Sequence, residues 1–233
     1  MGTVTYQQRR GQLQTYFDRT AVDAWARLTS TAPVGRIRAT VRAGRDAMRN
    51  TLLGYLPTDL SGARVFDAGC GTGAFSVAAA ERGAQVVAID LSPTLVELAR
   101  ERLPSQLQNG SIDFRVGDMF DAGLGEFDHV VAMDSLIHYR AADVVRVLAG
   151  FAARTRHSIV FTFAPKTPAL AAMHAVGRLF PRSDRAPAIE PIAEMSLRKH
   201  LSLEPALHSW RIGRTQRIAS GFYKSQAMEL LRI

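Results

Sequence analysis

Residues 64–75, R-V-F-D-A-G-C-G-T-G-A-F, have the residue types and spacing most suited to chemistry. A short apolar run ends at Asp67, and three glycines follow it at alternate positions. Glycines let the backbone approach a ligand closely, so a strand, a glycine turn and the start of a helix make a nucleotide site. Asp90 closes the next apolar run, V-V-A-I-D, where a carboxylate can accept hydrogen bonds from ribose hydroxyls.

The spacing of the glycines separates this loop from the dinucleotide fingerprint G-x-G-x-x-G. Here the third glycine, Gly73, comes one residue early, and Asp67 precedes the loop. D-x-G-x-G-x-G followed by a strand-final acid resembles the S-adenosylmethionine loop of class I methyltransferases. The alternative interpretation is a glycine turn without a ligand. Cys70 lies where the loop needs a small side chain, so we interpret it as a packing residue and not as a nucleophile.

From Arg64 onward predicted strands and helices alternate, which implies an α/β fold with a mostly parallel sheet and helices on both faces. After a first strand ending at Asp67, strands are predicted at 85–90, 112–116, 127–133, 158–163, 209–217 and 221–224, with 226–231 as a short tail. Ser92 and Pro93 predict a helix start. Further helices are predicted at 141–153, 169–180 and 191–201. We expect a helical cap over 1–60, a ligand-binding domain over 61–233, and an insertion at about 165–189 that covers the substrate.

The composition limits the classes of protein to which the chain can belong. Lys and Arg number 29 against 21 Asp and Glu, a net charge of +8, and all but three of these cations are arginines. Such a charge attracts nucleic acid, anionic lipid or an anionic small molecule. A single cysteine excludes an internal disulfide framework and suits a reducing compartment. There is no apolar run of membrane-spanning length and 1–10 is not expected to be a signal peptide, so we expect a cytoplasmic protein, with peripheral membrane contact as an open alternative.

Four arginines recur with helical spacing ahead of the first strand. Arg38, Arg42, Arg45 and Arg49 fall within an arc of about 60° at 100° per residue, beside an apolar stripe. They form either a solvated basic face or a cationic wall for an acidic substrate or a membrane.

Acidic residues end or directly follow the first four predicted strands, at Asp67, Asp90, Asp118 and Asp134. Ligands of open parallel sheets bind at this edge, and four acids there are costly unless hydrogen bonds or water satisfy them. In the methyltransferase interpretation Asp67 and the backbone of Gly69, Cys70, Gly71 and Gly73 contact the cofactor. Asp90 and Leu91 then bind the ribose, Asp118 and Met119 flank the adenine, and Asp134 and Ser135 lie near the methionine end.

The sequence after the fourth strand, M-D-S-L-I-H-Y, bears on the substrate. Enzymes that methylate planar amino groups commonly carry [DN]-P-P-[YF] at this place, so adenine or cytosine methylation is disfavoured. His138 and Tyr139 occupy positions where a substrate-facing group belongs. The alternative is that His138 is an ordinary core or surface histidine.

Four further blocks carry a more specific resemblance. They are D-S-L-I-H-Y-R-A-A-D, S-I-V-F-T-F-A-P-K-T-P, L-F-P-R-S-D-R-A-P and S-G-F-Y-K-S-Q-A. Together with the glycine loop they closely resemble the magnesium-protoporphyrin IX methyltransferase family of chlorophyll and bacteriochlorophyll synthesis, from about Tyr16 to Met228. The resemblance implies S-adenosylmethionine as cofactor, S-adenosylhomocysteine as product, and methylation of one propionate. Magnesium is then expected only within the porphyrin, with no metal held by the protein and no nucleic acid as partner.

The resemblance also implies roles for individual residues. His138 matches a histidine proposed for the active site, whereas Thr29 stands where some relatives carry a tyrosine proposed as catalytic, and Tyr16 could lie nearby. Substrate contacts are expected from Arg38, Arg42, Arg45, His138, Tyr139, His174, Arg182 and Arg185. A magnesium-chelatase subunit that hands over the porphyrin is a further candidate partner.

A propionate has an ordinary pKa of about 4.3 and is ionised at neutral pH, so the implied reaction needs no general base. An arginine on the reacting oxygen would stabilise the ground state more than the transition state. We therefore expect the arginines to hold the other propionate. The alternatives are a methyltransferase for another small carboxylate or hydroxyl substrate, and a non-catalytic S-adenosylmethionine- or RNA-binding protein.

Overall fold

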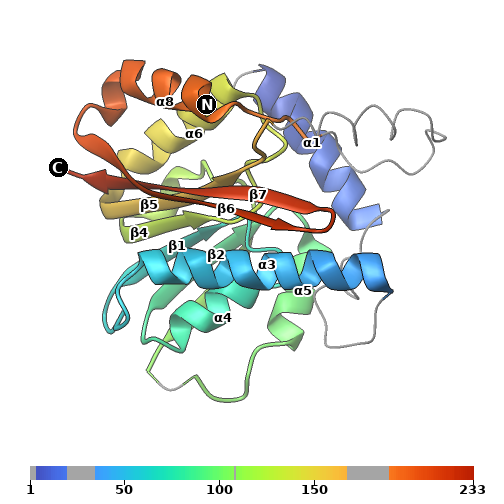
Figure 1. Ribbon diagram of the computed structural model, residues 1–233. Helices are drawn as coiled ribbons and strands as arrows, with labels where there is room; N and C mark the ends of the chain where they lie inside the picture. Colours follow the sequence, from blue (N-terminus) through green and yellow to red (C-terminus); the bar gives the residue numbers. More distant parts are fainter. Residues whose placement is uncertain (1–3, 20–34, 108, 167–188) are drawn as a thin grey trace.

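The computed structural model describes residues 4–19, 35–107, 109–166 and 189–233, which contain one seven-stranded sheet of order β3-β2-β1-β4-β5-β7-β6 (Figure 1). The strands are β1 Arg64–Ala68, β2 Gln85–Asp90, β3 Ser111–Val116, β4 Phe127–Ala132, β5 Thr155–Phe163, β6 Trp210–Ser220 and β7 Tyr223–Arg232. Strands β1 to β5 are parallel, and β7 pairs antiparallel with both β5 and β6. The predicted fold class, a mostly parallel seven-stranded sheet with helices on both faces, is confirmed.

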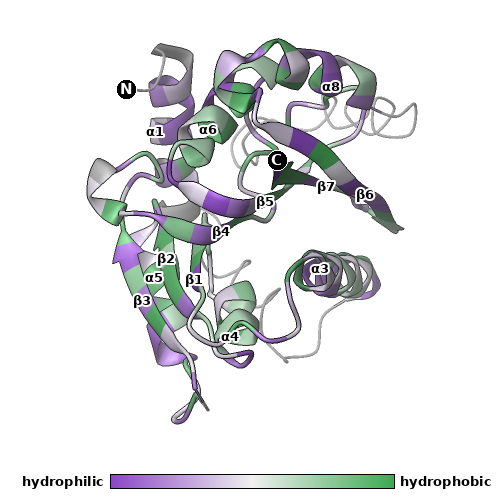
Figure 2. Cartoon of the chain, turned by 90° about the vertical axis from the view of Figure 1, so that its left-hand side faces the viewer, coloured by the Kyte–Doolittle hydropathy of each residue, from purple (hydrophilic) through white to green (hydrophobic). Residues whose placement is uncertain are grey.

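Helices cover both faces of this sheet (Figures 1 and 2). The described helices are α1 Val4–Arg19, α3 Arg36–Tyr55, α4 Ala74–Ala80, α5 Pro93–Glu101, α6 Ala141–Ala152 and α8 Glu194–Leu203, with short 3-10 turns at Ala122–Leu124 and Pro205–Leu207. The buried residues of α3, α4 and α5 share one hydrophobic cluster, and those of α1, α6 and α8 share the other. Ser92 caps α5 as predicted, because its Oγ accepts the Leu95 N–H at 3.2 Å.

The C-terminal segment differs most from the sequence-based expectation. Residues 226–231, expected as a tail, belong to β7, which runs between β5 and β6 and is buried from Ser225 to Leu230. Two polar residues in this stretch obscured the strand, Gln226 and Glu229. Both are satisfied inside the fold, Gln226 by Arg217 and Glu229 by Arg214. Smaller shifts affect β5, which begins at residue 155 and not 158, and α8, which begins at 194 and not 191.

Helix α3 is tied to the last two strands along its whole length. Met48, Leu52 and Leu53 are buried against the sheet, and Gly44 lies so close to Tyr223 that a Cβ would come within 2.5 Å of its ring. At the end of the helix, Arg214 donates to the Gly54 carbonyl at 3.0 Å. These contacts fix the helix that carries the arginine stripe relative to the sheet.

The residues just after β5 pair with a later segment of the chain at Ile192. The Lys166 N–H donates to the Ile192 carbonyl at 3.0 Å, and the Ile192 N–H donates to the Ala164 carbonyl at 2.8 Å. The helix predicted at 169–180 lies outside the described residues. Within the described ranges, no helix is both long and apolar enough to cross a membrane.

Candidate functional site

The glycine loop after β1 is held tightly against β2. The N–H groups of Gly69 and Cys70 both donate to the Ile89 carbonyl, at 2.8 and 3.0 Å. Gly69 has φ +87°, and a Cβ there would collide with the Ser135 side chain. Gly73, at φ +77°, precedes α4 and packs on Phe114. Glycine is therefore required at these two positions by both conformation and space.

Two acids predicted as ligand contacts also fix the loop. Asp90 accepts the Gly71 N–H at 2.9 Å on one carboxylate oxygen and the Ser92 N–H at 3.0 Å on the other. Each oxygen of a carboxylate has further acceptor capacity, so Asp90 can still bind a ribose hydroxyl. Asp67 accepts the Ser76 hydroxyl at 2.6 Å. Burial, reinforced by the charge of Asp90, raises the pKa of Asp67 to about 7, although the Ser76 hydrogen bond opposes this.

The single cysteine does not have the environment of a nucleophile. Burial raises the pKa of the Cys70 thiol well above its ordinary value, and the charges of Asp67 and Asp90 add to this effect. A thiol kept in the neutral form is inert. This agrees with the interpretation of Cys70 as a packing residue of the loop.

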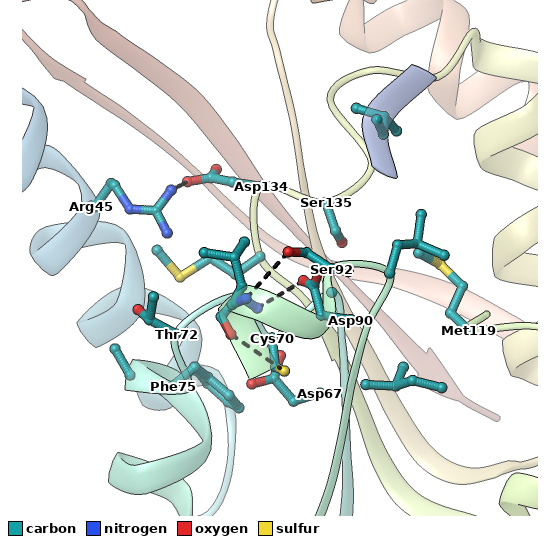
Figure 3. A pocket seen from close by; sticks show the side chains of 18 of the residues that line it. Arg45, Asp67, Cys70, Thr72, Phe75, Asp90, Ser92, Met119, Asp134 and Ser135 are labelled. Atoms are coloured by element: carbon teal, nitrogen blue, oxygen red, sulfur yellow. Dashed lines mark hydrogen bonds and ion pairs between the residues drawn. The ribbon is translucent and has the colours of Figure 1, made fainter. Parts of the chain in front are cut away.

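A cavity of about 460 Å³ opens at the carboxyl edge of the parallel strands (Figure 3). Its lining includes the glycine loop, Asp90, Leu91, Met119, Asp134, Ser135, His138, Tyr139 and, from α3, Arg42, Arg45 and Arg49. Figure 3 shows Arg45 and Asp134 toward one end and Met119 toward the other, with Asp90 between them. The volume lies in the range of small-molecule and cofactor sites.

Asp134 is the centre of a hydrogen-bond network at one end of the cavity. It has φ +55°, the only positive value among the described non-glycine residues. Its carboxylate pairs with Arg45 at 2.9 Å and accepts hydroxyl hydrogen bonds from Tyr223, Ser225 and Thr162 at 3.0 to 3.2 Å. No local pattern in the sequence indicated these partners, apart from the presence of Tyr223 and Ser225 in the block S-G-F-Y-K-S-Q-A.

At the other end, α1 lies against the loop that follows β3. Asp118 accepts the Tyr6 hydroxyl at 2.8 Å, forms an ion pair with Arg10 at 3.0 Å and accepts the Phe120 N–H at 2.9 Å. Met119 lines the cavity, whereas Asp118 does not, because its carboxylate is directed to α1. Leu13 and Gln14 of α1 also line the cavity, a contribution that sequence reasoning missed.

Tyr139 lies in the interior, beneath α1. Its ring stacks on that of Tyr6 with centroids 5.0 Å apart, and only 2% of the residue is exposed. Burial raises the pKa of its hydroxyl, and the neighbouring Tyr6 hydroxyl partly opposes this rise. The glycine cradle, in which a Cβ at Gly69 would not fit, and Asp90 together fit a nucleoside ligand.

The remaining predicted residues are placed as follows. His138 is 8% exposed and lines the cavity beside Tyr139. Arg38 is exposed and Tyr16 partly exposed, and neither lines the cavity. Thr29, His174, Arg182 and Arg185 lie outside the described residues. No group of three metal-ligating side chains occurs in the described part of the chain.

Comparison with family models gives two matches. Residues 132–232 match the model described as magnesium-protoporphyrin IX methyltransferase C-terminus, and residues 65–158 match a methyltransferase domain. The first match contains Asp134, His138 and the whole of β7, and the second contains the glycine loop and Asp90.

Individual proteins match over nearly their whole length. A magnesium-protoporphyrin O-methyltransferase of Rhodobacter capsulatus is 50% identical and covers 96% of this chain and 97% of its own. One from Synechocystis is 30% identical over 93% of this chain and 94% of its own. The crystal structure of the Synechocystis magnesium protoporphyrin IX methyltransferase with bound SAH, 28% identical, has a TM-score of 0.83 and covers 96% of this chain and 100% of that chain. The chain therefore belongs to the magnesium-protoporphyrin O-methyltransferase family of S-adenosylmethionine-dependent class I methyltransferases.

Proposed function

We propose that this chain transfers a methyl group from S-adenosylmethionine to one propionate of Mg-protoporphyrin IX and gives the monomethyl ester in bacteriochlorophyll synthesis. The observation that carries this proposal is one cavity that joins the glycine loop and Asp90 to His138 and to an arginine-bearing wall on α3. A nucleoside cofactor and an anionic substrate can therefore meet in one space.

The cofactor would be held along the carboxyl edge of the sheet. The glycine loop and Asp90 would hold the ribose, Met119 would lie at the adenine, and Asp134 and Ser135 would lie toward the methionine. When bound, S-adenosylmethionine supplies an electrophilic methyl group: the propionate oxygen forms the new O–C bond while the S–C bond breaks and its electrons remain on sulfur. No proton moves, since a carboxyl with an ordinary pKa of about 4.3 is already ionised.

The charges of the cavity wall suit this chemistry. Arg45 is 2.9 Å from Asp134, so its charge is largely offset at that end of the cavity. An uncompensated cation there would favour the ground-state carboxylate over the transition state. Arg42, which lies one turn earlier on the same wall of the cavity, would bind the second propionate.

His138 has two candidate tasks, of which we favour the first. It would orient the reacting carboxylate by a hydrogen bond, directly or through a magnesium-bound water. The other task is ligation of magnesium itself, although magnesium prefers oxygen ligands. His138→Ala should slow Mg- and Zn-porphyrin methylation alike if the histidine orients the carboxylate, and should reduce the discrimination between the metals if it ligates. Wild-type turnover in this variant would contradict both tasks.

Incubation with S-adenosylmethionine and Mg-protoporphyrin, with Zn- and metal-free porphyrin as controls, tests the proposed function. The expected product is a monoester that gains one methyl group by mass. A wild-type chain that binds the cofactor but leaves every porphyrin unmodified would contradict the proposal and favour another carboxylate or hydroxyl substrate. A chain that binds cofactor and RNA without turnover would favour a non-catalytic protein.

The finer assignments belong to the same proposal. Residues 1–60 would act as a helical cap on the methyltransferase domain at 61–233, which is supported by Leu13 and Gln14 in the cavity lining. Residues 165–189 would cover the substrate. An apolar macrocycle suits delivery by a chelatase subunit and work at a membrane surface, so we place the protein in the cytoplasm with peripheral membrane contact.

A further inference from the structure

Two large apolar side chains are exposed at one corner of the molecule. Ile37 is 59% exposed near the start of α3, and Phe222 is 52% exposed in the turn between β6 and β7. Residues 221 and 222 form a two-residue hairpin loop, since Ser220 pairs with Tyr223. Such a turn needs Gly221, at φ +54°, but it gains nothing from a phenyl ring at the next position. Phe222 therefore requires an explanation beyond the turn itself.

Contacts between the turn and the helix bring the two side chains to the same corner. The Ser220 hydroxyl donates to the Thr40 carbonyl at 2.9 Å, and Gly221 packs directly on the Thr40 side chain. Ile37 lies one turn before Thr40, whose hydroxyl donates to the Ile37 carbonyl at 2.8 Å. In Figure 1 the hairpin tip and the first turns of α3 lie at the same end of the molecule.

This corner continues the wall of the cavity. The same helix contributes Arg42 and Arg45 to the lining, and the residue after Phe222, Tyr223, donates to Asp134 inside the cavity. From Arg45 to Ile37 the helix advances by about 12 Å, at 1.5 Å per residue. Exposed Arg36 and Arg38 flank Ile37. The wall is thus cationic along its length, and at its outer end Ile37 and Phe222 add an exposed apolar surface.

We propose that Ile37 and Phe222 form an apolar platform for the part of the tetrapyrrole that projects from the cavity, an inference that rests on the proposed function. Protoporphyrin IX carries its two propionates on one side of the macrocycle and its two vinyl groups on the other. With the propionates directed to Arg42 and the cavity, the vinyl side extends along the wall to the platform. Ile37 and Phe222 then determine specificity for the apolar periphery and take no part in methyl transfer.

Phe222→Ser, Ile37→Ser and the double variant test this in the full-length chain. Leu203→Ser on α8, where Leu203 is 68% exposed, is the matched control. We expect the double variant to raise the KM for Mg-protoporphyrin about tenfold, as expected from the loss of apolar contact area. In the double variant the turnover number, the Kd for S-adenosylmethionine and the unfolding temperature should stay at wild-type values. Leu203→Ser should change neither these three quantities nor the KM.

A second substrate sharpens the test. Mg-deuteroporphyrin carries hydrogen in place of both vinyl groups, so its KM with the wild type should already be higher than that of Mg-protoporphyrin. The double variant should then raise the KM for Mg-deuteroporphyrin by a smaller factor. Direct titration of porphyrin fluorescence checks the same change without turnover. Equal effects on both porphyrins, or an unchanged KM, would overturn the inference.

The remaining outcomes are also distinguishable. If the variants lose binding to phosphatidylglycerol vesicles while KM in lipid-free buffer is unchanged, the corner is a lipid-docking surface and the platform is rejected. If the wild type forms no ester, the proposed function itself fails and this inference falls with it. A wild type with normal turnover and variants with unchanged KM would reject only the platform.

Discussion

Asp90 lines the cavity and also fixes the loop, because its carboxylate accepts the N–H groups of Gly71 and Ser92. Asp90→Ala should weaken S-adenosylmethionine binding by about 1.5–3 kcal/mol for each charged hydrogen bond to ribose that is lost. Calorimetry measures this loss. Asp113→Ala, at an exposed acid of β3, should leave the affinity unchanged. Unchanged affinity in Asp90→Ala would reject its role in cofactor binding.

Asp67 should make stability depend on pH in the direction opposite to most carboxylates. Burial raises its pKa from 3.8 to about 7, so between these values it is protonated in the folded protein and ionised in the unfolded chain. The unfolded state then binds fewer protons, and stability falls as pH rises through the window, at most about 1.4 kcal/mol per unit. In Asp67→Asn the free energy of unfolding should not fall in this way as pH rises.

Urea unfolding of the cofactor-free protein at about pH 5 and about pH 7 measures the effect. The free energy of unfolding of Asp67→Asn, relative to wild type, should increase from the lower to the higher pH. Parallel pH profiles for the two proteins would show that the Asp67 carboxyl does not titrate in this window.

The residues of the site differ in how far the sequence could predict them. The glycine loop, Asp90 and the Ser92 cap are local patterns, and each lies where the sequence placed it. The Asp134 network joins groups that are 28 to 91 positions apart. Tyr6 and Arg10 reach Asp118 across 112 and 108 positions. Pairings of this kind depend on the packing of distant elements, which a single sequence does not encode as a local pattern.

At the scale of elements, the same limit explains the error at β7. Alternation or a continuous apolar run predicts a strand, but residues 225–230 read S-Q-A-M-E-L, with three polar side chains in a buried stretch. Glu229 is tolerated there only because Arg214 binds it. The sequence still indicated seven strands, but it placed the start of the last one at residue 221, which lies in the turn before β7.

Arg214 joins three elements and provides a test of this explanation. It donates to Glu229 at 2.6 and 2.9 Å, to the last turn of α3, and lies over the Tyr55 ring at 4.5 Å. Arg214→Met would remove the ion-pair partner of the buried Glu229 carboxylate. We expect the free energy of unfolding to fall by about 3 kcal/mol. This value is at the low end for a broken buried pair, because half of the Arg214 side chain is exposed.

Denaturant unfolding checks this value against Arg156→Met, at an exposed arginine of β5, which should cost far less. Adding Glu229→Gln to Arg214→Met should restore part of the stability, because the amide carries no charge. If the double variant is less stable than Arg214→Met, the buried charge is not the cause of the loss.

At the scale of the whole molecule, the net charge of +8 is the property that most resembles that of a nucleic-acid-binding protein. The dependence of affinity on salt concentration separates a nucleic-acid-binding protein from a porphyrin-binding enzyme. A protein that neutralises six to ten phosphates loses about 10³–10⁵ in affinity between about 50 and 200 mM salt. A macrocycle with two carboxylates engages few arginines and keeps its apolar contacts, which salt does not screen.

We therefore expect the KM for Mg-protoporphyrin to rise only about two- to fivefold over that same salt range, since one or two ion pairs are weakened. Steady-state kinetics at the two salt concentrations measure the rise. Arg42→Gln should raise the KM at low salt and flatten its salt dependence, because the variant has already lost a contact that salt screens. Arg156→Gln, at an exposed arginine paired with Glu126 at 2.9 Å, is the control and should retain the wild-type dependence. If Arg42→Gln keeps the full salt dependence, the propionate is held by other cations and the role proposed for Arg42 is rejected.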